Sequence, residues 1–509
     1  MSPEVCAVDE DDGHGHAVVI GSGLAGLTAA RALANFMERV TVIDRDRLPR
    51  GAGRRRGVPQ ARHTHLLMPA AHQGLEQLFP GIVADLTRAG AVPVHLSRDT
   101  LLLGPAGWLP RSESGPTALS AGRDLIDAVV RDRLRADPKV AFLAEHEVVS
   151  LEPGRQDTVV GVWARGRDRR IPGGWGLRRL IRADFVVDAT GRGSCAPRWL
   201  AELGYPTPVE TLARTGITYA STVFAPPVGH VADWSSLLLM GSPDRPRQGM
   251  LHPIEGGRWS VTLSAADGGP PPTDHQGLLR AAGALRHPLL HEVIEAATPL
   301  GPVYACDRAD TRWRHYEKLR RWPDQFLVVG DAHVALDPAH GHGMTFAVQS
   351  ALVLDQMLSC HGTAVGLSYR LRRALARHLA PAWRASLGNP AAAGLGREPG
   401  NGLRARFGRW CTARLAAAAT TDPGAAELLL ERLRTGVPRT GALRPRRLWA
   451  VLRGRRGPLS TVPPSATHGP DARRRPPAAP PVPAFGVRVG STRPQRPLSS
   501  SAHRGGTGR

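Results

Sequence analysis

Short apolar runs that end at small or acidic residues recur through the first two thirds of the chain. HAVVI (16–20) and RVTVID (39–44) flank a stretch, Leu24–Phe36, in which apolar residues repeat at helical spacing. Two later runs, ADFVVDATG (183–191) and QFLVVGDA (325–332), are continuously apolar, which is typical of parallel strands buried on both faces. This pattern predicts an α/β fold that is built on a parallel sheet.

The hydrophobic pattern changes between these runs. The segments 216–224, 236–241 and 258–264 are strand-like, and the last of them alternates apolar with polar residues. Such alternation predicts an inserted, mainly antiparallel sheet with one exposed face. After Gly343 the spacing is helical to about Arg434, and beyond that no apolar face continues into the Pro-, Gly-, Ser- and Arg-rich end of the chain.

These changes predict six consecutive regions. They are a flexible leader (1–15), a dinucleotide-binding domain in two parts (16–204 and 305–365), a substrate domain between them (205–304), a helical region (366–453) and a disordered tail (454–509).

The strongly basic composition does not indicate nucleic-acid binding. The formal net charge is +22, but residues 441–509 alone contain fourteen arginines and one acidic residue, Asp471. The excess therefore lies mainly in the predicted tail, and no aromatic-basic motif accompanies it. The five cysteines are scattered, and no apolar run reaches the ~18 residues of a membrane span. We expect a cytoplasmic protein that has no membrane span.

The first glycine turn has the form of a dinucleotide fingerprint. Gly21, Gly23 and Gly26 follow a strand and open a helix, and Asp44 ends the next strand. In this motif the glycines admit a pyrophosphate to the helix N-terminus, and the acidic residue binds a ribose. We include Ala25 in the predicted site. The fingerprint alone leaves NAD and FAD open.

A second cluster, FLVVGDAHVALDPAHGHGM, favours a flavin. Asp331 follows a buried strand, where it can bind the ribityl hydroxyls. Pro338, Gly341 and Gly343 form a turn into a helix that begins near Met344, and its backbone N–H groups can face the flavin ring.

Read with RRGVPQARHTHLL, DATGRGS and HPIEGGRWSVTLS, these motifs resemble those of the FAD-dependent monooxygenases related to p-hydroxybenzoate hydroxylase and squalene epoxidase. The narrower likeness is to the bacterial flavin epoxidases of polyether pathways. The resemblance implies a discontinuous, Rossmann-like FAD domain with an inserted substrate domain. It adds Arg123, Arg45, Arg55 and Gln60 as FAD-binding residues.

The resemblance also implies the reaction. NAD(P)H, as co-substrate, reduces FAD; O2 then gives a C4a-hydroperoxide, which epoxidises or hydroxylates a hydrophobic unsaturated polyketide, terpenoid or aromatic metabolite. The cofactor carries this chemistry, so we predict no catalytic side chain.

Other functions remain open at this stage. The fold also suits a flavin-dependent reductase or cyclase of isoprenoid type, a flavin halogenase, or a non-catalytic scaffold. Such halogenases carry a Trp-x-Trp-x-Ile-Pro segment, which is absent, and a lysine near the glycine turn, whereas Lys139 and Lys318 are the only lysines. His63/His65 and His340/His342 resemble two halves of a metal site, but no Cys pair or carboxylate cluster lies beside them at ligand spacing. We therefore predict no metal.

Overall fold

The computed structural model describes residues 15–171, 174–213, 216–242, 244–307, 310–337, 341–363, 365–387, 403–435 and 463–464. The predicted leader up to residue 14, Pro338, His340 and the predicted tail apart from residues 463–464 lie outside the described residues.

A five-stranded, wholly parallel sheet forms the centre of the dinucleotide-binding part, as the apolar runs predict. Its strands lie in the order β21 (Phe326–Val328), β12 (Phe185–Asp188), β1 (His16–Ile20), β2 (Arg39–Asp44) and β8 (Val140–Ala144). The predicted α/β fold class is confirmed.

Both faces of this sheet are buried, which explains why its strands do not alternate. On β1, Ala17 and Val19 pack with helices, whereas Val18 and Ile20 face a three-stranded antiparallel sheet and α5. The helices on the first face are α1 (Leu24–Ala34), α2 (Pro69–Leu78), α3 (Ile82–Arg88), α4 (Arg123–Arg135), α8 (Gly343–His361) and α9 (Leu367–Leu387). The second face is covered by β9 (His146–Pro153), β10 (Val159–Arg167), β11 (Trp175–Arg182) and α5 (Ala196–Glu202).

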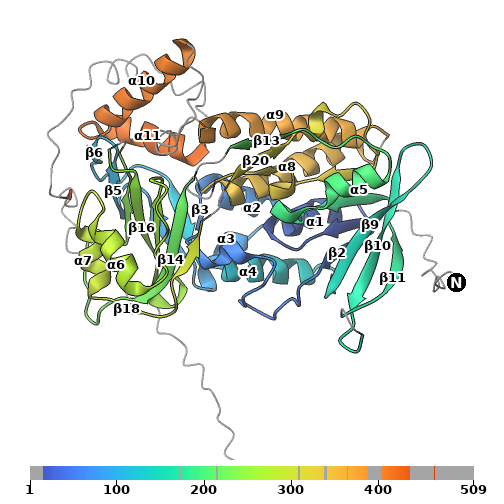
Figure 1. Ribbon diagram of the computed structural model, residues 1–509, viewed down its shortest axis with the longest axis horizontal. Helices are drawn as coiled ribbons and strands as arrows, with labels where there is room; N and C mark the ends of the chain where they lie inside the picture. Colours follow the sequence, from blue (N-terminus) through green and yellow to red (C-terminus); the bar gives the residue numbers. More distant parts are fainter. Residues whose placement is uncertain are drawn as a thin grey trace, which may run out of the picture. The chain divides into compact units, whose positions relative to one another are not determined.

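The predicted antiparallel insertion is an eight-stranded sheet (Figure 1). It contains β5 (Thr100–Gly104), β6 (Gly107–Trp108), β14 (Thr218–Ala225), β15 (Ser236–Leu239), β16 (Arg247–Ile254), β17 (Arg258–Ala265), β18 (Thr298–Pro299) and β19 (Tyr304–Cys306). β5 pairs with β15 in parallel register. The predicted substrate domain, 205–304, therefore omits two strands that come from before residue 110.

The two faces of the eight-stranded sheet differ in chemistry. One face packs on α6 (His275–Gly283) and α7 (Leu289–Glu295), and Trp259 lies in this apolar core (Figure 1). The other face carries the hydroxyl groups of Ser221, Ser260 and Thr262. Towards its β5 edge this second face becomes apolar and packs on α10 (Leu403–Ala418) and α11 (Pro423–Thr435).

Smaller elements complete the chain. They are β3 (Leu66–Leu67), β4 (Val92–His95) and β7 (Thr117–Ser120) in one sheet, β13 (Glu210–Ala213), β20 (Thr311–Arg314) and β22 (Val334–Ala335) in another, and the short 3-10 helices η1 (Pro59–Arg62), η2 (Gly191–Gly193), η3 (Glu255–Gly257), η4 (Tyr316–Lys318) and η5 (Gly330–Ala332). No helix within the described ranges is both long and apolar enough to cross a bilayer.

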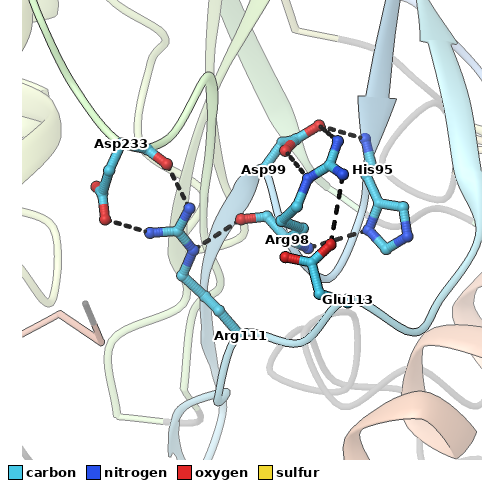
Figure 2. Close-up of polar contacts among 6 residues, drawn as sticks. All are labelled: His95, Arg98, Asp99, Arg111, Glu113 and Asp233. Carbon is cyan, nitrogen blue, oxygen red and sulfur yellow. Dashed lines mark hydrogen bonds and ion pairs between the residues drawn. The ribbon is translucent and has the colours of Figure 1, made fainter. Parts of the chain in front are cut away.

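A buried arginine joins the β5 end of the eight-stranded sheet to the loop before β15. Arg111 donates from Nε to the carbonyl oxygen of Arg98 at 2.7 Å and from Nη1 to Asp233 Oδ2 at 2.6 Å (Figure 2). Only 4% of its side chain is exposed. The neighbouring Arg98 is half exposed and pairs with Asp99 and Glu113 at the surface. Arg111 therefore has the contacts of an internal clamp, and Arg98 those of a surface ion pair.

Arg111→Met should lower the free energy of unfolding by about 2 kcal/mol, because it leaves backbone and carboxylate acceptors without their donor. Urea denaturation monitored by tryptophan fluorescence measures this as a lower midpoint at unchanged slope. Arg98→Met is the matched control and should cost less than about 1 kcal/mol, since exposed ion pairs contribute little. An equal loss in both variants would contradict the clamp.

Candidate active site

The fingerprint turn is built by close backbone packing. A Cβ atom at Gly26 would lie 1.8 Å from the carbonyl oxygen of Gly21, so the first turn of α1 tolerates no side chain there. A Cβ at Gly23, by contrast, would meet nothing within 4 Å. Gly23 is also the N-cap of α1, and no side chain caps the helix. The first N–H groups of α1 therefore face open space, as an anion site requires.

Asp44 lies at the end of β2 beside this turn. Its Oδ2 accepts hydrogen bonds from the backbone N–H and the hydroxyl of Ser22, at 2.8 and 2.6 Å, and its Oδ1 accepts from the N–H of Asp46 at 2.8 Å. Burial raises the pKa of Asp44, but the charge of Arg55 and the hydrogen bonds from Ser22 outweigh it and hold the pKa below its usual value. The carboxyl group is therefore an ionised acceptor.

Arg55 is the buried partner of this carboxylate. Its Nη2 donates to Asp44 Oδ2 at 2.5 Å and its Nη1 to the carbonyl oxygen of Ser22 at 2.8 Å. Only 4% of the Arg55 side chain is exposed. Arg55 thus holds the carboxylate of Asp44, the residue that is predicted to bind the ribose. Arg45 and Gln60, by contrast, are exposed at the surface. Contact of these three residues with FAD stays a prediction.

The flavin motif packs against the dinucleotide fingerprint at Gly330. A Cβ at Gly330 would lie 2.6 Å from the Cβ of Ala25, so η5 packs directly on the first turn of α1. Asp331 follows Gly330 and is thereby placed beside the fingerprint turn. Two segments more than 300 positions apart in sequence form one site, as the flavin hypothesis requires.

Three arginines, Arg192, Arg123 and Arg312, influence the carboxyl group of Asp331. Arg192 Nε lies 3.6 Å from Asp331 Oδ2, and Arg123 is close enough for its charge to act on the carboxyl. Burial raises the pKa of Asp331 above its usual value despite these charges. Arg123 is the first residue of α4, and Asp127 Oδ1 accepts from its Nε at 2.7 Å. Arg123 is therefore near enough to Asp331 to act on its charge, and its contact with FAD stays a prediction.

The start of α8 provides a second uncapped helix N-terminus. Gly341 and Gly343 flank the N-cap residue His342, and a Cβ at either glycine would meet nothing within 4 Å. Met344 is buried under the first turn. α8 packs along α1, and Thr28 joins them through its hydroxyl, which donates to Leu24 O at 2.8 Å and lies 3.4 Å from Ala347 O.

These residues fit FAD. One uncapped helix start suits the pyrophosphate, the ionised Asp44 suits a ribose, Asp331 suits the ribityl hydroxyls, and the start of α8 suits the electron-rich edge of the flavin ring. The fit rests on the open space at Gly23 and Gly343, where an added Cβ would meet nothing within 4 Å, and on the backbone N–H donors around these two positions.

Two features of the site were not predicted from the sequence. The hydroxyl of Tyr219, on β14, donates to the carboxylate of Asp337, and both side chains are almost fully buried. Asp337 immediately precedes the turn into α8, so this bond ties the eight-stranded sheet to the flavin motif. Asp188, at the end of β12, accepts from Thr190 and Ser194 hydroxyls at 2.6 Å each, which fixes the DATGRGS turn. The Asp-Pro pair before the turn was the available signal for Asp337.

Gly23→Ser and Gly26→Ala should separate cofactor binding from folding. Serine at Gly23 has room and caps α1, so the free energy of unfolding should change by less than about 0.5 kcal/mol while FAD binding is lost. Alanine at Gly26 should instead lower the melting temperature of the flavin-free protein sharply, because α1 must move off β1. Thermal melts and FAD titration of both variants measure this. Normal FAD affinity in Gly23→Ser would rule out pyrophosphate binding at this turn.

Asp44→Asn should weaken the acid dependence of stability. A carboxyl with a lowered folded-state pKa stabilises the fold fully above its unfolded pKa of about 3.9, and this stabilisation is lost as the pH falls through the folded pKa. The variant should be less stable at neutral pH, and its melting temperature should fall less steeply with acid than that of the wild type. Asp132→Asn, in an exposed pair, is the control and should follow the wild type. Parallel curves for all three proteins would contradict the assignment.

Comparison with known proteins gives the same assignment. A family model described as an FAD binding domain matches residues 15–385. Protein Rv3254 of Mycobacterium tuberculosis (strain ATCC 25618 / H37Rv) is 35% identical over 384 residues, 72% of this chain and 78% of that protein. A kynurenine 3-monooxygenase of Salinispora tropica is 26% identical over 68% of this chain and 72% of that enzyme. The flavin-dependent brominase Bmp2 shares the fold, with a TM-score of 0.59 at 15% identity over 83% of this chain and 94% of that one.

The family model covers most of the chain, and its span includes both motifs of the candidate site. The narrower likeness to polyether epoxidases stays a prediction. The chain belongs to the FAD-binding-domain family, among its FAD-dependent monooxygenases.

Proposed function

We propose that this monooxygenase takes electrons from NAD(P)H and transfers one oxygen atom of O2 to a hydrophobic, unsaturated small molecule, by epoxidation or hydroxylation. The observation that carries the proposal is the contact of Gly330 with Ala25, which unites a dinucleotide turn and a flavin motif in one site. FAD, when bound, supplies the redox and oxygen chemistry.

The chain's own residues bind and orient the cofactor. The Gly21–Gly26 turn and the N-terminus of α1 receive the pyrophosphate, and Asp44, braced by Arg55, receives the ribose. Asp331 and Arg123 lie at the ribityl position, and the first turn of α8 donates towards the ring. The Tyr219–Asp337 bond sets the distance between that turn and the sheet.

An apolar strip on the eight-stranded sheet supports a hydrophobic substrate. On the hydroxyl-bearing face, Met250 lies in register between Thr262 and Leu238. Met250, Leu238 and Met240 are half-buried, and Leu238 and Met240 pack against the apolar cluster that this face forms with α10 and α11. Methionine adapts its shape to apolar ligands because its side chain is flexible and polarisable. A substrate that extends from the flavin turn along this strip would meet hydroxyls first and apolar side chains beyond them.

The structure disfavours halogenation for this chain, even though a brominase shares its fold. The ammonium of Lys139 donates to the carbonyl oxygen of Ala34, at the C-terminal end of α1. That end is about 16 Å from the fingerprint turn, at 1.5 Å of rise per residue over eleven residues. Lys318 is exposed on η4. Lys139 therefore lies at the far end of α1 from the fingerprint turn, near which the halogenase reaction needs a lysine.

Oxygen transfer is tested with the purified full chain. NAD(P)H oxidation should accelerate when unsaturated terpenoid, polyketide or aromatic candidates are added, and isotopically labelled O2 should enter the product as one atom, measured by mass spectrometry. Isoprenoid reduction or cyclisation would give products without label, and a scaffold would oxidise no NAD(P)H with any candidate. Asp331→Ala should purify without flavin absorbance. If that variant remains yellow, the flavin assignment of the second motif is wrong.

A further inference from the structure

The segment His63–His65 passes from the eight-stranded sheet to the dinucleotide-binding part. It follows η1 and leads into β3, which pairs with β7. Its first two residues contact the hydroxyl-bearing face of the sheet, and its third lies near α4. Because this segment contacts both parts, the position of the sheet can determine the position of residues in the dinucleotide-binding part.

The sheet holds the first two residues of this segment tightly. His63 Nδ1 lies 2.8 Å from Ser221 Oγ. The Thr64 N–H donates to Thr262 Oγ1 at 3.3 Å, and the Thr64 hydroxyl lies 2.8 Å from both Thr262 Oγ1 and Ser260 Oγ. Ser221 Oγ in turn lies 2.6 Å from Thr262 Oγ1.

Thr262 is fully used by these contacts. A hydroxyl offers one donor and two acceptor sites, and Thr262 has three partners: the Thr64 N–H, the Thr64 hydroxyl and the Ser221 hydroxyl. The peptide that joins His63 to Thr64 is therefore fixed on the sheet. Its carbonyl oxygen, that of His63, has a defined position.

That carbonyl fixes the tautomer of His65. His65 Nδ1 lies 2.8 Å from His63 O. A carbonyl oxygen only accepts, so Nδ1 carries the ring proton and Nε2 keeps its lone pair. Burial, and then the charge of Arg123, lower the pKa of His65 to about 3, so the ring stays neutral at physiological pH. His65 Nε2 is thus a permanent hydrogen-bond acceptor.

Strand register brings His65 close to the start of α4. Leu66 pairs with Ser120 in antiparallel register, which sets His65 opposite residue 121, two positions before Arg123. Arg123 acts electrostatically on both His65 and Asp331. A neutral acceptor and a carboxylate that are both near one cationic arginine suit a ligand with several hydroxyl or N–H donors.

We infer that His65 binds the flavin half of FAD, accepting a hydrogen bond at Nε2 from a hydroxyl or N–H group, and that Thr262 positions it through the His63 carbonyl. This inference rests on the proposed function only in requiring FAD. It makes the hydroxyl-bearing sheet face part of the cofactor site.

His65→Leu should raise the Kd for FAD about tenfold in the flavin-free full chain, equivalent to about 1.4 kcal/mol. The Kd for ADP, which carries only the adenosine diphosphate half, should not change. His65→Gln, whose amide oxygen can replace Nε2 as acceptor, should recover most of the affinity. His72→Leu is the matched control, because His72, half-buried on α2, also bonds a backbone carbonyl, that of Thr117, and the variant should bind both ligands as the wild type does. Calorimetric titration measures all of these constants.

Thr262→Val tests the positioning step. It should weaken FAD binding less than His65→Leu does, and it should add nothing in the His65→Leu background, since both variants remove the same contact. Wild-type FAD affinity in His65→Leu, or equal losses for FAD and ADP, would overturn the inference. A wild-type chain that binds ADP but not FAD would contradict the proposed function itself.

Discussion

The site depends on how closely η5 approaches the first turn of α1. Gly330 and Ala25 are so near that a methyl group on the glycine would overlap the alanine. This approach sets Asp331 against the fingerprint turn and brings α8 alongside α1. Two uncapped helix N-termini then border one space, and their dipoles give it a positive potential without any side chain. A larger residue at either position would separate the halves of the cofactor site.

Buried arginines strengthen that potential and explain much of the polar packing. Arg55 is paired with Asp44, and Arg123 with Asp127, in each case with little exposed surface. Arg131 is almost fully buried and donates to the carbonyl oxygens of Pro49 and Gly51. Hydrogen-bond partners lower the cost of burying a guanidinium, so these contacts support the fold, although Nε of Arg55 and Nε of Arg131 make no hydrogen bond within the described residues. The remaining positive field favours a ligand with two phosphate charges.

The local sequence pattern was sufficient to predict those strands and helices whose formation depends on nearby residues alone. The strand-glycine-helix pattern predicts β1, α1 and β2, and continuous apolar runs predict β12 and β21, because a central parallel strand is buried on both faces whatever its neighbours are. The pairing of β5 with β15 was missed, since register across more than 130 residues depends on packing between segments and leaves no local period. The β9–β11 sheet was missed for the same reason.

The candidate site residues show the same division between features that depend on local sequence and features that depend on long-range packing. The glycines, Asp44 and Asp331 belong to motifs whose spacing reflects the backbone geometry, and the structure brings these motifs together. Arg123, which the family resemblance added, is near enough to act on Asp331. The pairing of Arg55 with Asp44 could not be predicted, because it depends on where the loop that carries Arg55 folds back; contact of Arg55 with FAD stays a prediction. The hydroxyl of Tyr219 bonds Asp337, which is 118 positions away in sequence, and no local pattern predicts such a contact.

Two sets of long-range contacts connect the eight-stranded sheet to the candidate cofactor site. Tyr219 bonds the turn that leads into α8, and Thr262 and Ser221 hold the segment that ends at His65. All three side chains project from β14 and β17, whose pairing sets Ser221 opposite Thr262. A shift of these two strands, for example on substrate binding to the adjoining strip at Met250, would be felt by both contacts at once. In the proposed function, the eight-stranded sheet would both receive the substrate and transmit such a shift to the cofactor site.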